Sequence, residues 1–165
     1  MQLTSLDLSL HYLGKLYPLY QTATTSKKTE IKLLQDKLVI SLAPEYSELT
    51  KEMLDKAIDT FLFKQSKRLI EKRIRHYQSY FKLKPRKITI ERSIKKWGSC
   101  NHLRELTFNY LLVTKAPEAI DYVIVHEMCH MVHLNHDRSF WRLLGSIIPN
   151  YEAHEALLNQ VNHRG

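Results

Sequence analysis

The sequence has few of the residues that staple or interrupt a chain, and it has no long hydrophobic run. It contains two cysteines and four glycines in 165 residues. Residues 1–21 lack the basic leader, apolar segment and small-residue cleavage site of a secretory signal. No stretch approaches the roughly eighteen apolar residues of a membrane span. We therefore expect a cytoplasmic protein without a membrane partner, in which Cys100 and Cys129 are free thiols.

The composition shows neither the polar bias of a disordered chain nor the repeats of a fibrous one. Hydrophobic residues make up 44% and charged residues 25% of the sequence, close to the average of globular proteins. At 165 residues, the chain is long enough to bury a core without disulfide bridges. We expect one domain over residues 1–165, with a strand-rich part at 1–44 and a mainly helical part at 45–165.

Acidic residues are nearly absent from one segment. From Lys64 to Arg104 the chain has fourteen basic residues and only two acidic ones, Glu71 and Glu91, which gives a charge of +12. The rest of the chain has eleven basic and fifteen acidic residues. Such a local field attracts phosphates and other polyanions. Two interpretations stay open, a contact with nucleic acid or nucleotides and a solvated face without a partner.

The hydrophobic residues change their period along the chain. Alternation with period two predicts antiparallel strands at the N-terminus, with turns at Gly14-Lys15 and Gln35-Asp36. After Pro44 a period near 3.6 predicts a long helix that breaks at most once, with lysines and arginines on its outer face.

Shorter strands and further helices are predicted after Pro85. The patterns favour strands at 88–92 and 106–110, a helix from Pro117 to about Leu134, a helix that Asp137 caps, and a last helix at 151–161. The predicted class is α+β, with N-terminal antiparallel strands, a long basic helix, a short sheet and C-terminal helices.

The residues with the clearest chemical pattern are His126, Glu127 and His130. Two histidines four residues apart lie on one face of a helix and can bind the same ion, with Glu127 beside the open coordination position. This is the HExxH arrangement. The surrounding helix is apolar on nearly every side, and buried imidazoles without partners cost free energy that a bound cation removes.

A catalytic zinc site needs a third protein ligand, and we expect it to be His136. An uninterrupted helix would turn His136 away from His130, so the chain must leave helical geometry between them. Leu134-Asn135 is where we expect this, because asparagine enters the left-handed region readily. His133 is the competing ligand, but we expect it to lie on the same helix as His130.

Several other residues are candidates for the rim of this site. Three imidazoles leave a metal its full charge, so that it activates a water, with Glu127 as general base. The second donor to the oxyanion stays open among Tyr151, Arg92, Lys96 and His133. An extended peptide can add to an exposed strand, and the strand ending at Tyr110 is one candidate.

Three more residues have equally plain structural explanations. Asn109 can orient substrate or complete a turn. Trp97 and Cys100 lie in a loop that either approaches the site or serves packing alone. We expect Phe140 and Trp141 to pack behind the metal helix.

Several blocks resemble the YgjP-like family of predicted zinc metallopeptidases, which is related to the WLM and SprT-like proteases. These blocks are Lys96–Cys100, Phe108–Leu112, Ile120–His130 and Asn135–Asp137 followed by Phe140-Trp141. The resemblance covers about residues 45 to 160. It implies a zincin-type domain in which His126, His130 and His136 bind one Zn²⁺ and Glu127 is the catalytic base. Relatives of the SprT-like and WLM type act on proteins attached to DNA, which makes nucleic acid a partner to test.

Three functions are therefore weighed against one another. The leading hypothesis is a zinc-dependent metallopeptidase with a peptide or protein substrate. The first alternative is a metal-dependent hydrolase of nucleotides or phosphoanhydrides, in which the basic segment holds phosphate. The second is a non-catalytic nucleic-acid-binding module with structural zinc, although a closed structural site usually has four protein ligands.

Overall fold

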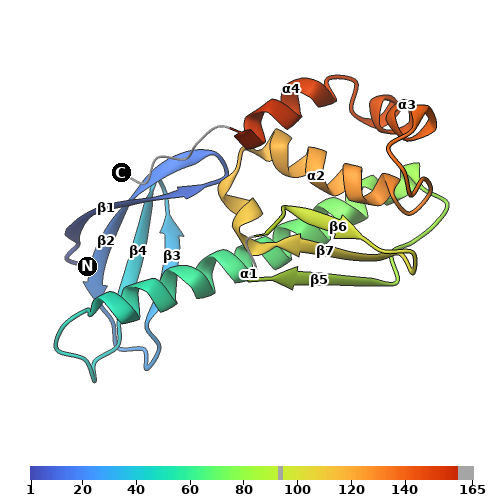
Figure 1. Ribbon diagram of the computed structural model, residues 1–165. Coiled ribbons are helices and arrows are strands. Elements are labelled where there is room, and N and C mark those ends of the chain that lie inside the picture. The colour runs from blue at the N-terminus through green and yellow to red at the C-terminus, as the bar shows by residue number, and fades with distance from the viewer. Residues whose placement is uncertain (93–94, 160–165) are drawn as a thin grey trace.

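The N-terminal strands form a four-stranded sheet. A computed structural model describes residues 1–92 and 95–159. The strands are β1 (Thr4–Tyr12), β2 (Lys15–Ala23), β3 (Glu30–Leu34) and β4 (Lys37–Leu42). Their order is β1-β2-β4-β3, so the two expected antiparallel hairpins are joined by a parallel pair between β2 and β4 (Figure 1).

The turns of both hairpins use residues with positive φ. Gln35 has a φ of 56° in the second turn, as the Gln35-Asp36 prediction requires, and Leu13 and Gly14 have φ values of 49° and 75° in the first. The first turn lies one residue before the predicted Gly14-Lys15, because Lys15 already begins β2. A Cβ on Gly14 would lie 2.8 Å from the Cα of Ala116. Glycine therefore allows both the turn and its close approach to Ala116.

The long helix α1 (Lys51–Tyr77) has 27 residues and no break. The side chain of Thr50 accepts a hydrogen bond from the N–H of Met53 and caps its N-terminus. A 3-10 helix follows at Gln78–Tyr80. The first half of α1 packs against the N-terminal sheet, and its second half contacts α2 (Pro117–Cys129), so one helix joins two hydrophobic clusters (Figure 1).

A second, smaller sheet lies beside α2. Its strands are β5 (Lys87–Glu91), β6 (Gly98–Cys100) and β7 (Glu105–Asn109), in the order β5-β7-β6. The predicted strand at 106–110 ends one residue early. Tyr110 begins a 3-10 helix (Tyr110–Thr114), because the side chain of Asn109 caps the N–H of Leu111. In the order β5-β7-β6, β7 is the central strand and β6 is an edge strand.

The C-terminal part consists of helices, and the α+β class is confirmed. The helix α2 is followed by α3 (Arg138–Ile147), α4 (Tyr151–Ala156) and a 3-10 helix (Leu157–Asn159). The prediction that the first of these helices runs to about Leu134 is wrong, because α2 ends at Cys129. The predicted end of the last helix at Val161 lies outside the described residues.

An ion pair fixes α2 on α1. The Nε and Nη2 atoms of Arg73 donate hydrogen bonds of 2.7 and 2.5 Å to the two carboxylate oxygens of Asp121. The hydroxyl of Tyr77 donates a third bond of 2.9 Å to Oδ2 of Asp121. Burial, followed by the interaction with Asp121, raises the pKa of Tyr77 to about 12. This network holds α2 in place five residues before its first histidine, His126, and it neutralises Arg73 of the basic segment.

Candidate metal centre

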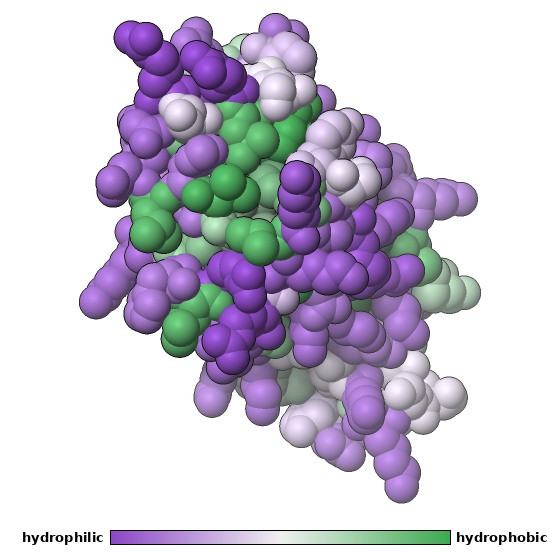
Figure 2. All heavy atoms as spheres, turned by 90° about the vertical axis from the view of Figure 1, so that its right-hand side faces the viewer, coloured by the Kyte–Doolittle hydropathy of each residue, from purple (hydrophilic) through white to green (hydrophobic). Residues whose placement is uncertain are grey.

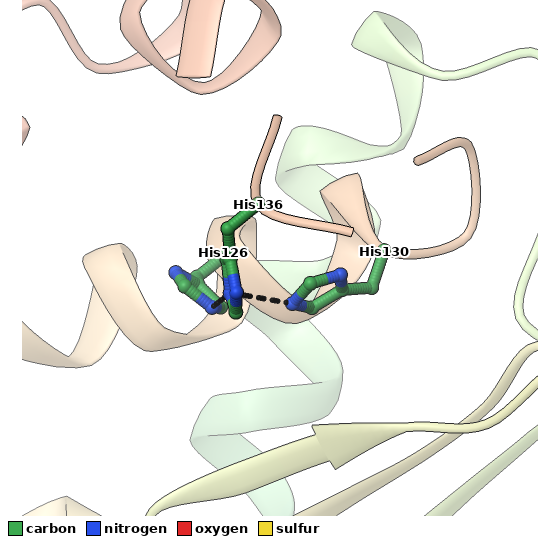
Figure 3. A group of neighbouring side chains, drawn as sticks. All are labelled: His126, His130 and His136. Carbon is green, nitrogen blue, oxygen red and sulfur yellow. Dashed lines mark hydrogen bonds between the residues drawn. The ribbon is translucent and has the colours of Figure 1, made fainter. Parts of the chain in front are cut away.

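Three imidazoles converge at the C-terminal end of α2. His126 lies in the last turn of the helix, His130 is its C-cap residue, and His136 comes from the loop before α3. The Nε2 atom of His136 lies 3.0 Å from Nε2 of His126 and 3.1 Å from Nε2 of His130. One donor atom from each ring lies within 4.8 Å of the other two. Figure 3 shows the rings pointing toward one another.

The chain reaches this arrangement by leaving the helix earlier than predicted. Beyond Cys129, the N–H groups of Met131 and Val132 bond to the carbonyls three residues before them, which turns the chain tightly. Asn135 is not among the described residues with positive φ, so the expectation of a left-handed asparagine there is wrong. Asp137 caps α3 as predicted, because its Oδ1 accepts a hydrogen bond of 3.0 Å from the N–H of Phe140.

His133 supports the site through its backbone, and its ring is not part of the three-imidazole group. Its carbonyl oxygen lies 3.0 Å from Nδ1 of His130. A carbonyl only accepts hydrogen bonds, so Nδ1 of His130 must carry the proton. In the neutral ring, Nε2 of His130 then presents a lone pair toward the other two histidines. His133 also lies beyond α2, contrary to the prediction that it shares the helix of His130.

The neutral forms of two of these rings are favoured. Burial first, and then the neighbouring His130 and His136, lowers the pKa of His126 to about 4. Burial also lowers the pKa of His130. Protonated rings would repel one another here, whereas neutral rings offer lone pairs to a cation.

The donor set fits a divalent metal ion. Ligand nitrogens about 2.0 to 2.1 Å from a tetrahedral ion are separated by about 3.3 Å, close to the observed 3.0 and 3.1 Å. The Nε2 atom of an imidazole either carries a proton or presents a lone pair, but not both. Nε2 of His136 therefore cannot donate a hydrogen bond to one neighbouring histidine and accept one from the other. Hydrogen bonds alone do not satisfy all three nitrogen atoms.

Aromatic rings hold the three histidines in place, as expected for Phe140 and Trp141. The ring of Phe140 is fully buried, with centroids 4.6 to 4.9 Å from those of all three imidazoles. Trp141 stacks on His136 with ring centroids 5.7 Å apart, and Tyr151 stacks on Trp141 with centroids 5.4 Å apart. Tyr151 therefore reaches the site through Trp141.

Glu127 is buried against the edge strand β6. Glu127 is only 8% exposed. Burial raises the pKa of Glu127 to about 7, and the charge of Lys96 acts in the opposite direction. A Cβ placed on Gly98 would lie 2.9 Å from Cγ and 3.2 Å from Oε1 of Glu127. The glycine thus gives the carboxylate room.

The predicted rim residues fall into two groups. Lys96 and Cys100 lie within electrostatic reach of Glu127, and burial, followed by the charge of Glu127, raises the pKa of the Cys100 thiol to about 11. Trp97 is partly buried against the core, under the ammonium group of Lys115 at 5.1 Å. The loop therefore serves both packing and the surroundings of Glu127.

The second group consists of Arg92 and Asn109, whose side chains have other partners. Arg92 forms a 2.5 Å ion pair with Asp59 of α1, and its guanidinium lies 4.6 Å from the ring centre of Phe63. Asn109 is 5% exposed and uses its side-chain oxygen to cap the turn at Leu111, which is the structural alternative weighed for it.

Two residues near the site were missed by the sequence analysis. Gly98 was not singled out there, because its contact with Glu127 joins positions far apart in the chain. Tyr122 is 4% exposed, and its ring lies 5.5 Å from that of His126. Burial first, then Glu155, which accepts a hydrogen bond from its hydroxyl, raises the pKa of Tyr122. Its position four residues before His126 is the signal that predicts this contact.

A comparison with protein families gives the class of this protein as a metal-dependent hydrolase. Residues 5–161 match the family model described as "YgjP-like, metallopeptidase domain". The chain belongs to this YgjP-like metallopeptidase family, which supports a metal ion and a peptide or protein substrate.

Comparisons with individual proteins do not extend this assignment. A structure titled "Crystal structure of the metallopeptidase zymogen of Pyrococcus abyssi abylysin" is similar to this chain, with 17% identity and a TM-score of 0.49. The similarity covers 54% of this chain and 90% of that one. No curated protein matches the sequence significantly. No helix among the described residues is both long and apolar enough to cross a membrane.

Proposed function

We propose that this protein is a zinc-dependent metallopeptidase. The observation that carries the proposal is the convergence of the three imidazole Nε2 atoms of His126, His130 and His136. These residues would hold the Zn²⁺ ion. A zinc ion in such a site is a Lewis acid that makes water a nucleophile near neutral pH and polarises a carbonyl group.

The chain's own residues supply the proton transfers and the orientation of the ligands. Glu127 accepts a proton from the attacking water and donates it to the leaving nitrogen, a role that suits a pKa raised to about 7 by burial. The carbonyl of His133 fixes the tautomer of His130. Lys96 is our candidate for the second donor to the oxyanion, because its charge acts on Glu127, whereas Arg92 is paired with Asp59.

The substrate peptide is expected to bind along β6. The sequence pointed to the strand ending at Tyr110, but β7 ends before it and has a strand on each side. An extended peptide adds only to an edge. The strand β6 is an edge strand, and its Gly98 contacts Glu127. A peptide paired with β6 would thus pass the proposed general base.

Metal removal tests the proposal. Untagged protein is expected to contain about one zinc ion per chain and to cleave members of a peptide library. A chelator should abolish cleavage, and added Zn²⁺ should restore it. Elemental analysis and mass spectrometry of the peptides measure both quantities. Metal-containing protein that cleaves no peptide, or cleavage that survives complete metal removal, would contradict the proposal.

The same purified protein tests the two alternative functions. The charge of Lys96 acts on Glu127, which favours hydrolysis of a phosphate bond, since an ammonium group can hold phosphate. Release of phosphate or pyrophosphate from nucleoside triphosphates, without peptide cleavage, would support that function. The reading with structural zinc lacks a fourth ligand, because the described residues form a group of three histidines.

The contact of Gly98 with Glu127 gives a second test. Gly98→Ala places a methyl group 2.9 Å from Cγ of Glu127, so the carboxylate must shift. We expect a loss of about 1 to 3 kcal/mol in the free energy of unfolding and at least about a tenfold loss in turnover. Denaturant unfolding and peptide cleavage measure the two effects.

Gly145→Ala is the matched control for this substitution. Its Cβ would lie 3.5 Å from the Tyr151 ring, which is ordinary contact, and Gly145 is inside α3. The control should keep full turnover and gain up to about 1 kcal/mol of stability. Equal turnover in the two variants would show that Gly98 does not position Glu127.

We also propose that the part of the basic segment on α1 contacts nucleic acid. Lys64, Lys67, Arg68 and Arg75 line a shallow depression of about 380 Å³ along α1. Lys67→Glu/Arg68→Glu is expected to weaken binding of single-stranded DNA at least about tenfold and to reduce its salt dependence. Fluorescence anisotropy at several salt concentrations measures this. Binding that ignores both the substitutions and salt would contradict a contact here.

A further inference from the structure

A groove of about 740 Å³ lies between β3 and the N-terminal half of α1. We call it the β3–α1 groove, and its lining includes all of residues 30–34 together with α1 residues between Met53 and Gln65. None of the three histidines lines it. In Figure 1 the N-terminal sheet and the end of α2 that carries the histidines lie toward opposite ends of α1. A helix of 27 residues is about 40 Å long, so this groove is separate from the candidate metal centre.

The floor of the groove is apolar and one of its walls is a strand edge. Ile31 and Phe61 are 7% and 6% exposed, whereas Leu33 and Leu34 on β3 remain 39% and 41% exposed. Among the described residues, the strand β3 pairs with β4 alone, so it is an edge of its sheet. Alternate backbone N–H and C=O groups of such a strand point away from its partner and can pair with another extended segment.

The lining of the groove carries a net positive charge. It contains five lysines, Lys27, Lys28, Lys32, Lys56 and Lys64, and two glutamates, Glu30 and Glu45. Lys32 pairs with Glu30 at 2.9 Å, but the other four form no salt bridge within residues 1–92 and 95–159. The pKa of Glu30 is lowered first by the hydrogen bond from Lys32, and the charges of Lys64 and Lys28 lower it further. These lysines therefore converge on the groove from a loop, a strand and a helix.

We propose that the β3–α1 groove binds an extended acidic segment of another protein, which adds to β3 as a fifth strand. Successive side chains of an extended segment point to opposite faces, so one set continues the apolar face of Ile31 and Leu33, on which α1 packs. The acidic set continues the opposite face, which carries Lys32, and the net positive charge around the groove attracts it. The exposed strand edge and the apolar floor favour a protein segment over a nucleic acid, which offers neither backbone pairing nor apolar side chains.

Binding of a designed peptide tests this proposal without requiring hydrolysis. The probe is a fluorescein-labelled decapeptide of alternating glutamate and valine, and the protein is the full chain carrying Glu127→Gln, so that cleavage cannot remove the probe. Lys28→Glu/Lys56→Glu is expected to weaken binding at least about tenfold. The control Lys82→Glu/Lys84→Glu makes the same charge change on exposed residues outside the groove and should change the Kd less than about twofold. Fluorescence anisotropy measures both.

N-methylated peptides distinguish strand addition from simple charge attraction. The amides of all valines point to one side of an extended peptide and those of all glutamates to the other. Methylation of one set should abolish binding, and methylation of the other should leave it nearly unchanged. Equal effects of the two sets, equal binding of a lysine-valine decapeptide, or absence of binding would each overturn the proposal. So would displacement by an equal concentration of single-stranded DNA from protein that also carries Lys67→Glu/Arg68→Glu.

Discussion

Replacement of Glu127 by glutamine is expected to lower peptide turnover by about 10² to 10⁴, the usual contribution of a general base. The amide has nearly the same shape as the carboxylate, so it fits the space beside Gly98. It cannot accept the proton from the attacking water. Turnover with saturating substrate and zinc content by elemental analysis are the two measurements.

The metal content distinguishes a lost base from a lost site. The three imidazoles do not depend on the ionisation of Glu127, so the variant should keep about one zinc ion per chain. Its stability should change little, or rise, since a neutral amide is easier to bury than a charge. Full turnover with zinc present would remove Glu127 from the mechanism, and loss of zinc would assign it a role in metal binding instead.

Exposed hydrophobic residues lie in the segment that joins His130 to His136. Figure 2 views the molecule from the side that carries α3 in Figure 1, and hydrophobic residues gather in the upper part of this face while hydrophilic ones cover most of the rest. Val132 and Leu134, in the segment between α2 and α3, are 46% and 65% exposed. They are exposed because the chain leaves the buried helix at Cys129. If the protein cleaves peptides as we propose, we expect its substrates to carry apolar residues near the cleaved bond.

Local spacing predicts the part of the site that lies within one helix. Two histidines four residues apart must share a helix face, so the pairing of His126 with His130 follows from helix geometry alone. The capping role of Asp137 is equally local. His136 is also brought to the site, although the chain turns immediately after α2 and not at Leu134-Asn135. A helix end depends on tertiary contacts as well as on local residues, which is why its position was misjudged.

Contacts between distant segments could not be read from spacing. Gly98 meets Glu127 only because β6 is an edge strand that lies along α2. The pairing of Arg92 with Asp59 likewise joins a strand end to the middle of α1. For the same reason, the parallel join of the two N-terminal hairpins was not predicted. Periodicity shows which face of an element is buried, but not which element covers it.

Removal of the His136 imidazole is expected to weaken zinc binding more than any substitution outside the three histidines. His136→Ala leaves two protein ligands, one short of the three that a catalytic zinc site uses. Loss of an outer partner of a ligand already costs about 10- to 100-fold in affinity, so we expect at least about 100-fold here. Peptide turnover should fall to background. Zinc titration with a competing chelator measures the affinity.

His133→Ala is the matched control, because it removes the imidazole that competes for the same role by sequence. Its carbonyl, which contacts Nδ1 of His130, stays in the alanine variant. The control should therefore bind zinc within about threefold of the parent protein, a change below 1 kcal/mol. If His133→Ala lost zinc while His136→Ala retained it, the third ligand would be His133. Equal retention in both would mean that His126 and His130 bind zinc without either residue.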